Sequence, residues 1–405
     1  MRILLINNQH YLKGGAHAVY FNTAKLLREK GHEVYFFSMK DDNMIEYEYS
    51  SYFPKLIDYN KLSLFSKIIA AKSFLYNKEA YCKIKNYVKV IKPDIAHVHL
   101  FMGGLTVSIL RALKECNIPV IHTVHDYRLI CPAYTFLDRN NEICEKCHDG
   151  HFIRCAYKKC SLEKKILPSI ILSFDAYFRK YFHSPLKYID KFIFVSKFSK
   201  NIHISFNKEY MKNSTVLYNF NPNKIGNSVP LKGKYLLYFG RLSREKGIEM
   251  LIEAAKDLKA QLKIAGIGPL YSKLLKSTEQ NTNIEILGFK SGKDLWQLIQ
   301  GCSYVCVPSE WYENNPLSII ESFSLGKPVI GSKIGGIPEL LENKRGFLFN
   351  VKDYESLKNT INIALNISDS EYQKYSENVL NFAKNVLTKD YYYEKLTEIY
   401  NMVLE

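Results

Sequence analysis

The stretch KYLLYFGRLSREKG, residues 234–247, decides the fold class because a short apolar run leads directly into a glycine and a basic loop. An apolar run of this length, bounded by glycine, is typical of a buried strand in a parallel sheet. Gly240 allows the backbone to turn sharply, and Arg241 and Lys246 follow it. Ligand-binding loops of doubly wound sheets lie at the carboxyl ends of the strands. We therefore expect a strand here, with two cations in the loop after it.

The same order of strand, loop and helix recurs along the whole chain. We expect the other buried strands at Arg2–Asn7, His32–Ser38, Ile95–Leu100, Pro119–Thr123, Ala260–Gly266, Asn283–Leu287, Tyr304–Val307 and Pro328–Gly331. Alternating strands and helices indicate parallel sheets covered by helices. A chain of 405 residues also exceeds what one hydrophobic core usually organises. The predicted fold class is α/β, with two Rossmann-like doubly wound domains facing a cleft.

A segment rich in asparagine and proline separates the two periodic regions, and such a composition is typical of a linker. We place the first domain at residues 1–205, the linker at 206–232 and the second domain at 233–387. The last stretch, about residues 388–405, has an amphipathic pattern. We expect it to form a helix that packs back on the first domain.

A second motif, PSEWYENNPLSIIESFSLGKP at residues 308–328, follows another of the expected strands. We expect Asn314 or Asn315 to cap a helix with Pro316 at its first position, and Gly326 to end that helix. Free amide groups at such a helix start can bind phosphate and sugar oxygens. The motif therefore predicts a second ligand loop in the same domain.

Two cations and two carboxylates give these motifs their chemistry. Arg offers a planar fork for phosphate and Lys a compact point charge, which suits a diphosphate leaving group. Glu321, about a turn and a half inside the expected helix, could bridge the two vicinal hydroxyls of a ribose. Glu313, in the loop before that helix, could bind a sugar hydroxyl. Taken singly, each carboxylate also fits an ordinary surface residue, and the basic loop also fits a solvated turn.

Together with SKIGGIPE at residues 332–339, these motifs resemble the retaining glycosyltransferases of family 4, which have the GT-B fold. The resemblance covers nearly the whole chain. It implies that Arg241 and Lys246 bind the diphosphate of a donor, that Glu321 binds its ribose, and that Glu313 contacts the transferred sugar.

The resemblance implies further donor contacts around these four residues. They are Gly288 and Phe289, which match the segment that meets the base, and the loop residues Asn314, Asn315, Pro316 and Leu317. The family often carries glycine after the first glutamate, so the two asparagines here bear on the choice of sugar. Gly335 and Gly336 fit a tight structural turn as well as a ligand contact.

The expected first domain adds a glycine pair and several histidines. Gly14 and Gly15 lie in a loop after the first strand, before an expected helix at about 17–30, and resemble the glycine loop of the family that approaches the donor or the acceptor. PVIHTVHD, residues 119–126, resembles the active-site segment in which the residue matching His125 faces the donor sugar. His99 and Asp126 are candidates for the acceptor side, although a lone histidine near a strand end is more often a packed structural residue.

The resemblance also implies the reaction. Transfer with retention is expected at the front face, where the leaving phosphate itself accepts the proton of the acceptor hydroxyl. The protein then positions the reactants and stabilises charge, with His125, Glu313, Arg241 and Lys246 as catalytic candidates. Because Arg and Lys take the place of a divalent cation, no metal cofactor is expected for catalysis. The donor is expected to be a nucleotide-diphosphate sugar of the UDP, GDP or ADP type.

Five of the nine cysteines fall within thirty residues. The spacing of Cys144, Cys147, Cys155 and Cys160 is compatible with a tetrahedral structural zinc site, and Cys131 precedes them. Reduced buried thiols and disulfides are the other two explanations, and a cytosolic chain argues against disulfides. The cluster lies just after His125, where it could form part of the acceptor site.

The net charge of +16 is concentrated in two windows. Residues 51–100 hold 9 Lys/Arg against 3 Asp/Glu, and residues 151–200 hold 11 against 3, so these windows contribute (9−3)+(11−3) = +14. Both windows also carry aromatic and aliphatic residues, which suits the surface of an anionic membrane. Nucleic-acid binding and solvated helix faces would explain the same composition.

The sequence shows neither a secretory signal at its start nor an apolar run long enough to cross a bilayer. We therefore expect a cytoplasmic protein, peripheral on the inner face of the cell membrane. The leading hypothesis is a transferase that moves a sugar to a lipid-linked saccharide acceptor during the assembly of a surface polysaccharide or glycolipid. A nucleotide-sugar epimerase of the same architecture is the alternative. A basic, zinc-containing protein that binds nucleic acid is a remote one, since it leaves the Glu313–Glu321 motif unexplained.

Overall fold

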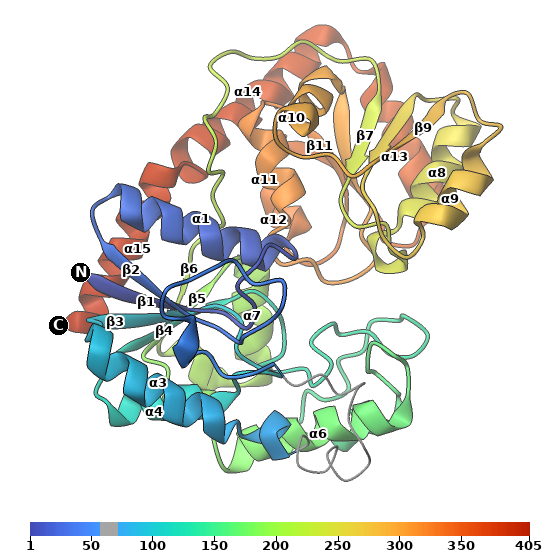
Figure 1. Cartoon of the computed structure of the whole chain (residues 1–405). Coiled ribbons are helices and arrows are strands. Elements are labelled where there is room, and N and C mark those ends of the chain that lie inside the picture. The colour runs from blue at the N-terminus through green and yellow to red at the C-terminus, as the bar shows by residue number, and fades with distance from the viewer. Residues whose placement is uncertain (57–71) are drawn as a thin grey trace. The chain divides into compact units, whose positions relative to one another are not determined.

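A computed structural model describes residues 1–56 and 72–405 of the chain (Figure 1). The described chain divides into two compact units. The first comprises Met1–Leu217 and Tyr393–Glu405, and the second comprises Tyr218–Tyr392. Each unit contains a six-stranded parallel sheet, which confirms the predicted α/β class with two Rossmann-like domains.

The sheet of the first unit has the strand order β2-β1-β3-β4-β5-β6. Its strands are β1 (Arg2–Ile6), β2 (Glu33–Phe37), β3 (Ile95–Val98), β4 (Val120–Val124), β5 (Lys191–Phe194) and β6 (Ser214–Val216). The register pairs Ile6 with Val98, and Val98 with His122. The carboxyl ends of β1, β3 and β4 therefore share one edge of the sheet, which is where doubly wound folds carry their ligand loops.

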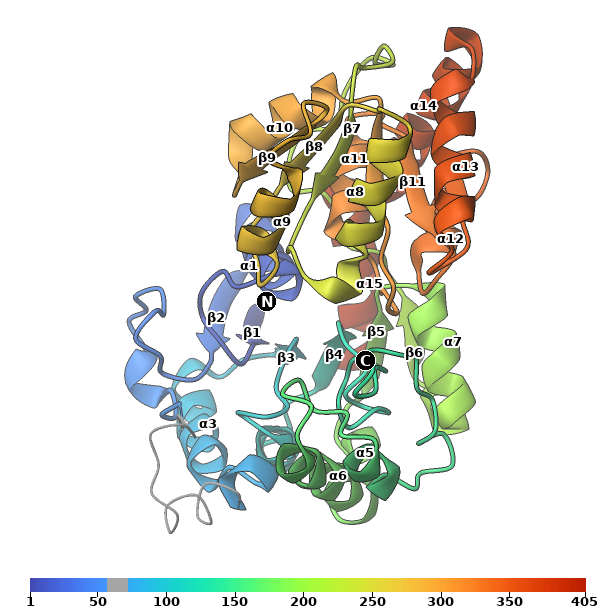
Figure 2. The same ribbon diagram turned by 90° about the vertical axis from the view of Figure 1, so that its right-hand side faces the viewer.

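Helices cover both faces of this sheet, with α1 on one face and α3 and α4 on the other (Figures 1 and 2). The helices and 3-10 turns of the unit are α1 (Gly15–Glu29), η1 (Ser50–Tyr52), α3 (Lys78–Ile91), α4 (Val107–Glu115), α5 (Ile153–Tyr157), α6 (Ile166–Tyr181), η3 (Pro185–Lys187), α7 (Lys197–Phe206) and η4 (Lys208–Met211). Side-chain caps fix several starts: Asn77 accepts from the amide of Ala80, and Ser196 from that of Ser199.

The C-terminal helix α15 (Lys389–Leu404) belongs to the first unit from Tyr393 onward. The hydroxyl of Tyr400 lies 2.7 Å from Nδ1 of His97, and that of Tyr393 lies 2.9 Å from Nε2 of His32. Tyr400 and Leu396 are fully buried. The helix is therefore fastened to the first unit by apolar burial and by two tyrosine–histidine hydrogen bonds.

The sheet of the second unit has the order β12-β11-β10-β7-β8-β9. Its strands are β7 (Leu236–Phe239), β8 (Leu262–Ala265), β9 (Ile284–Gly288), β10 (Tyr304–Val307), β11 (Val329–Ser332) and β12 (Gly346–Phe349). Its helices and turns are η5 (Arg244–Lys246), α8 (Ile248–Asp257), α9 (Tyr271–Thr278), α10 (Gly292–Gly301), α11 (Leu317–Ser324), α12 (Ile337–Leu341), α13 (Tyr354–Asn366) and α14 (Asp369–Val386).

One buried cluster forms the core on one face of the second sheet. Leu236, Ile264 and Tyr304 from the strands meet Leu251 of α8 and Leu357 of α13, and each is at most 1 % exposed. Such continuous apolar strands are expected when helices cover both faces of a parallel sheet. The core therefore keeps the strands rigid, so that the loops at their carboxyl ends start from fixed positions.

The structure differs from the sequence prediction at several boundaries. The predicted linker 206–232 begins too early, because η4 and β6 lie within it and belong to the first unit, where β6 pairs with β5. The strands β5, β6 and β12 were not predicted; β6 is only three residues long and half-buried, so its own pattern is weak. Gly15 is the first residue of α1 and does not lie in the loop before it.

Candidate active site

The loop after β7 turns at Gly240, which has a φ of +148° that side-chain-bearing residues rarely adopt. The hydroxyl of Tyr238 donates to the carbonyl of Arg241 at 2.7 Å and fixes the turn. A Cβ at Gly266, after β8, would lie 1.9 Å from the carbonyl oxygen of Gly240. The two loops therefore pack backbone to backbone, while the side chain of Arg241 is exposed.

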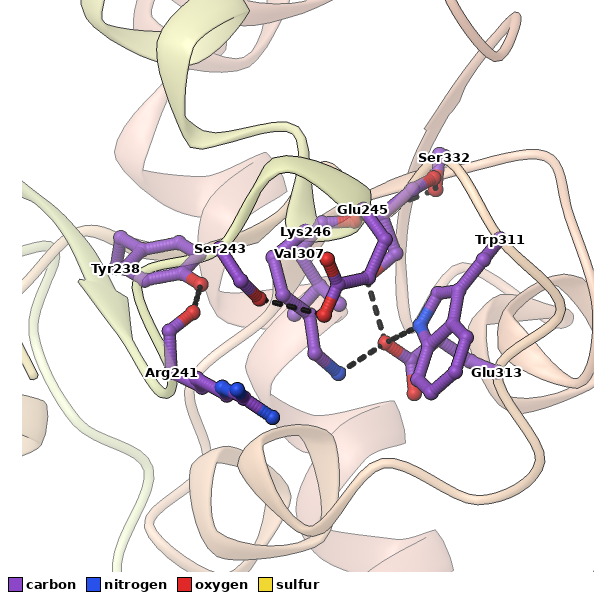
Figure 3. Close-up of polar contacts among 10 residues, drawn as sticks. Tyr238, Arg241, Ser243, Glu245, Lys246, Val307, Trp311, Glu313 and Ser332 are labelled. Carbon is purple, nitrogen blue, oxygen red and sulfur yellow. Dashed lines mark hydrogen bonds and ion pairs between the residues drawn. The ribbon is translucent and has the colours of Figure 1, made fainter. Parts of the chain in front are cut away.

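Glu313 is the centre of a polar cluster that joins this loop to the loop after β10 (Figure 3). Its Oε1 atom accepts from Nζ of Lys246 at 2.5 Å, from Oγ of Ser309 at 2.7 Å and from Nε1 of Trp311 at 2.8 Å. The Nζ atom of Lys246 also lies 5.1 Å from the centre of the Trp311 ring. Glu313 is 7 % exposed, so three donors, one of them the Lys246 cation, compensate a buried carboxylate.

These contacts decide the charge of Glu313. Burial alone would raise the pKa of its carboxyl, but Lys246 and the hydrogen bonds from Ser309 and Trp311 outweigh burial and lower it. Glu313 and Lys246 therefore form a charged pair at neutral pH. The prediction treated them as separate ligand groups, and the structure brings them into direct contact.

Backbone contacts between loops hold this cluster in place. A Cβ at Gly247 would lie 1.8 Å from the carbonyl oxygen of Pro308, and the amide of Glu310 donates to the carbonyl of Glu245 at 2.8 Å. Gly247 has a φ of +67° and opens α8. The loops after β7 and β10 are thus fastened by a close approach that only glycine permits.

The loop after β11 packs against the same segment. A Cβ at Gly335 would lie 2.4 Å from the carbonyl oxygen of Glu313, and the amide of Gly336 donates to that oxygen at 2.7 Å. Ser332 donates to the carbonyl of Ser309 at 2.6 Å. Of the two roles open for the glycine pair, the contacts support the structural one, since Gly335 supports the backbone that carries Glu313.

The start of α11 differs by one residue from the predicted cap. Pro316 is the N-cap residue and the helix begins at Leu317, so Pro316 is not at its first position. Neither Asn314 nor Asn315 caps the helix; the side-chain oxygen of Asn315 accepts from the amide of Asn219 at 2.9 Å. Within the described chain no side chain caps α11. The amides of Ile319 and Ile320 donate to the carbonyl of Pro316, so the amides before them are the ones available to a ligand. Gly326 follows the helix with a φ of +70°, as expected.

Glu321, on α11, contrasts with Glu313. Its carboxylate forms no hydrogen bond or ion pair with any described residue, and burial raises its pKa to about 7. An unpaired carboxylate in such a place carries a desolvation cost that a hydroxyl-bearing ligand would relieve. Gly288 ends β9 with a φ of +69°, and Phe289 after it is 67 % exposed, so this strand end offers an accessible aromatic face.

In the first unit, the predicted residues lie at the carboxyl ends of β1, β3 and β4. Gly14 is the N-cap of α1 and has open space beside it. His99 and His125 contact each other, with Nδ1 of His99 2.8 Å from Nε2 of His125. Burial and neighbouring histidines lower the pKa of His125 to about 3, so its ring is neutral at neutral pH. Asp126 accepts from the amide of Arg128 at 3.0 Å, and the hydrogen bond to His99 holds the His125 ring.

The cysteine segment brings its thiols together. One small cavity is lined by Cys131, Pro132, Phe136, Leu137, Cys144, Cys147, Cys155 and Cys160, and all five of these cysteines are free. Burial raises the pKa of Cys131 to about 12, and burial with the neighbouring Cys144 raises that of Cys147 to about 11. Among the described residues, no group of three or more Cys, His, Asp or Glu side chains already stands in an arrangement that could hold a metal ion. The zinc site stays a prediction.

Sequence reasoning missed the donors that hold Glu313. Ser309 and Trp311 lie four and two residues before it, and a buried carboxylate at a strand end requires such partners, but nothing in the spacing singles them out. Tyr238 was assigned to a strand, and its hydroxyl reaches the loop that follows.

The raised pKa of Glu321 predicts a pH-dependent stability. Ionising Glu321 in the folded protein costs free energy, so its contribution to stability is full below pH 4.5 and is lost as pH rises through about 7. The variant Glu321→Gln avoids that loss. We compare the difference in Tm between this variant and the wild type at two pH values. We expect this difference to be more favourable to the variant at pH 8 than at pH 5, by about 3 °C or more.

The control for this measurement is Glu377→Gln, which changes an exposed carboxylate of α14. A Tm difference for Glu321→Gln that stays constant between pH 5 and pH 8 would show that Glu321 is solvated or paired.

Two relatives show what this chain is similar to. It is 28% identical over 418 residues to an uncharacterized 42.6 kDa protein in the cps region of Klebsiella pneumoniae, covering 99% of this chain and 100% of the relative. It is 32% identical over 136 residues to the putative colanic acid biosynthesis glycosyltransferase WcaL of Salmonella typhimurium. That match covers 30% of this chain and 34% of the relative.

A solved structure shares the fold. HepE of Anabaena, in complex with UDP, superposes with a TM-score of 0.66 at 17% sequence identity, covering 99% of this chain and 100% of HepE. A likeness at this identity speaks for the architecture of two doubly wound units.

Models of two glycosyltransferase families match consecutive parts of the chain. Residues 13–220 match Glycosyltransferase Family 4, which is about half of the chain, and residues 220–382 match Glycosyl transferases group 1. The boundary between the two matches falls close to the boundary between the two units. The chain is therefore a glycosyltransferase of family 4, with the GT-B fold.

Proposed function

We propose that this enzyme transfers a sugar, with retention of configuration, from a nucleotide-diphosphate sugar to a saccharide acceptor. The observation that carries the proposal is the loop cluster of the second unit. It combines the Lys246–Glu313 pair, the exposed Arg241, the uncapped start of α11 and the unpaired Glu321. The cations and amides in this set suit a diphosphate, and the carboxylates suit the hydroxyl groups of the ribose and of the transferred sugar. The match to transferase models favours transfer over epimerisation.

The cationic end of this cluster suits the diphosphate. Arg241 has no side-chain hydrogen bond within the described chain and is exposed, so its fork is available for phosphate oxygens. Lys246 is held by Glu313, so its ammonium group is already fixed in place before a donor binds. Preorganised cations stabilise the charge that grows on a leaving diphosphate without a metal ion.

The carboxylate end suits the nucleoside and the sugar. Glu321 would accept hydrogen bonds from the vicinal ribose hydroxyls, which relieves its unpaired burial. Phe289 offers an exposed ring face to a base, next to Gly288. Glu313 and the loop Asn314–Leu317 are the proposed contacts of the transferred sugar. HepE was solved with UDP, which supports a nucleoside-diphosphate sugar as the donor.

For the first unit we propose Gly15 as a contact of the donor and His125 as a contact of the transferred sugar. His99 and Asp126 are the proposed acceptor-side residues. Each lies at a carboxyl strand end of its own sheet, or on the helix that follows it. Since His125 is neutral, its proposed role is a hydrogen bond rather than proton transfer. The leaving phosphate is then the group that accepts the acceptor's proton, as front-face retention requires.

The proposed acceptor is a lipid-linked saccharide of a surface polysaccharide. The names of the two relatives refer to a cps region and to colanic acid biosynthesis, which supports polysaccharide assembly. No described helix is both long and apolar enough to cross a bilayer. A protein acting on lipid-linked saccharide would therefore use a surface that docks on the membrane.

Helix α6 offers such a surface. Leu167, Phe174 and Tyr181 repeat at helical spacing along it and are 66 %, 65 % and 63 % exposed. Lys165 and Lys180 on the same helix region are also exposed. Exposed apolar side chains beside lysines fit an anionic membrane surface, with the helix lying in the interface. Of the basic window 51–100, residues 57–71 lie outside the described residues.

We further propose that Cys144, Cys147, Cys155 and Cys160 hold a structural zinc ion. All four line one cavity, and four thiolates are a donor set that zinc prefers. Binding would require small side-chain rotations and loss of the thiol protons, since no three of the described thiols already stand as a metal site. The ion would stiffen a segment that contains few regular elements.

The donor site is tested by thermal unfolding of the full chain with UDP, GDP and ADP sugars. A tight donor is expected to raise Tm, because it binds the folded state alone. Arg241→Ala and Lys246→Ala should weaken donor affinity by about tenfold or more, as each removes a charge-assisted contact. Glu321→Gln should also weaken it. Arg244→Ala, which removes an exposed cation of the same loop, is the matched control and should bind like the wild type. No protection by any nucleotide sugar would contradict the proposal.

Membrane docking is tested by flotation with vesicles containing anionic lipid at low salt. The wild type should float, and raising the salt concentration should reduce the bound fraction, since lysine–lipid attraction is screened. Phe174→Glu should abolish flotation. Leu231→Glu changes a residue of the second unit that is 79 % exposed and should float like the wild type. Equal flotation of both variants would rule out α6 as the docking face.

The zinc proposal is tested by metal analysis of the purified chain. One zinc ion per chain is expected, with loss of the ion and a lower Tm in Cys144→Ser. Cys82→Ser changes an exposed thiol outside the cluster and should keep the metal. A metal-free wild type purified without chelators would exclude the site.

A further inference from the structure

Three histidine rings form a stack inside the first unit. His97 lies in β3, and His99 and His125 follow the ends of β3 and β4. The ring centres of His97 and His99 are 4.6 Å apart with an interplanar angle of 24°, and those of His99 and His125 are 5.1 Å apart at 13°. Nδ1 of His99 lies 2.8 Å from Nε2 of His125. The ring of His125 is therefore held by this hydrogen bond, which joins two nearly parallel rings edge to edge.

The inner end of the stack is fixed by polar contacts. Nδ1 of His97 lies 2.7 Å from the hydroxyl of Tyr400, and its Nε2 lies 2.7 Å from Oγ1 of Thr123. The ring of Tyr20 meets His99 edge-on, with centres 5.5 Å apart. His97 and His99 are both fully buried. Neither ring can turn without breaking these contacts.

The stack is uncharged. Burial and the neighbouring histidine lower the pKa of His97 to about 3, and burial with four neighbouring histidines holds the pKa of His99 well below its usual range. Each neutral ring carries one N–H group. In the bond between His99 and His125, one ring must therefore donate and the other accept.

The other nitrogen of His99 decides which ring donates. Within the described chain, Nε2 of His99 has no hydrogen-bond partner. A proton on that atom would leave a buried N–H group unpaired, whereas a proton on Nδ1 leaves only an unpaired lone pair there. Orphaned buried N–H groups are the rarer and costlier case. His99 therefore carries its proton on Nδ1, and this N–H group donates a hydrogen bond to Nε2 of His125.

We propose that His99 is a positioning residue that holds His125 as the tautomer protonated on Nδ1. His125 then presents an N–H donor, and not a lone pair, on the side of its ring away from His99. A donor suits an oxygen atom of a sugar or a phosphate. This assignment of His99 rests on the proposed function, in which His125 contacts the transferred sugar, and it replaces the acceptor-side role considered for His99.

Three variants of His99 separate this role from packing. His99→Asn places a side-chain amide near the former Nδ1 position, so it keeps a donor toward His125. His99→Gln places its amide near the former Nε2 position, and His99→Phe keeps the ring volume without either nitrogen. The readout is the ¹⁵N chemical shift of the His125 ring in full-length protein labelled with ¹⁵N-histidine, assigned by comparison with His125→Gln.

The wild-type spectrum is expected to show a protonated Nδ1 and an unprotonated Nε2 for His125. His99→Phe and His99→Gln should shift His125 toward the other tautomer, and His99→Asn should keep the wild-type pattern. We expect the same ranking of the variants in kcat, measured with a nucleotide sugar that protects the enzyme against thermal unfolding. Phe and Gln should lower kcat at least tenfold with a smaller change in KM, since a wrong tautomer leaves binding groups in place.

A wild-type His125 protonated on Nε2 overturns the proposal, and this result needs no variant. An unchanged tautomer in both His99→Phe and His99→Gln also overturns it. A changed tautomer with unchanged kcat refutes the role of His125 in transfer, and with it the positioning role. If the wild type turns over no nucleotide sugar while the tautomers behave as expected, the proposed function fails and the control of the His125 ring by His99 stands.

Discussion

The buried carboxylate of Glu313 is the interaction on which the second unit's loop cluster depends. A carboxylate at 7 % exposure is tolerated because Lys246, Ser309 and Trp311 all donate to one of its oxygens. Those donors come from two different loops, so the cost of burying Glu313 is met only when both loops are in place. Glycines 247 and 335 allow the backbones to approach closely enough. The cluster is therefore assembled by the protein itself, before any ligand arrives.

Glu313 and Glu321 show how one motif gives two carboxylates opposite properties. Glu313 is buried and Glu321 is partly buried. A cation and two other donors outweigh burial and lower the pKa of Glu313, whereas burial raises the pKa of Glu321 to about 7 and no described group offsets it. The first is part of the scaffold that holds Lys246. The second is left with an unmet hydrogen-bonding capacity, and that is the property of a ligand-binding group.

The sequence was sufficient for the fold class and for most strands, because apolar runs bounded by glycine and proline recur with helical segments between them. It was insufficient for Ser214–Val216, which has no clear apolar pattern. These three half-buried residues form a strand because they pair with β5. Likewise, the sequence motifs pointed to Lys246, Glu313 and Glu321 as site residues. The contacts of these side chains depend on which loops meet in three dimensions and could not be predicted. The Lys246–Glu313 pair, the Trp311 donor and the His97–His99–His125 stack all join residues whose spacing carries no signal.

The central claim is that the second unit binds a nucleoside diphosphate at the carboxyl ends of β7, β9 and β10. A crystal structure of the full chain with a nucleoside diphosphate that protects it against unfolding tests this claim most directly. We expect the diphosphate within hydrogen-bond distance of Arg241, Lys246 and the first amides of α11, and the ribose hydroxyls on Glu321. A nucleotide bound elsewhere, with Glu321 still unpaired, would contradict it.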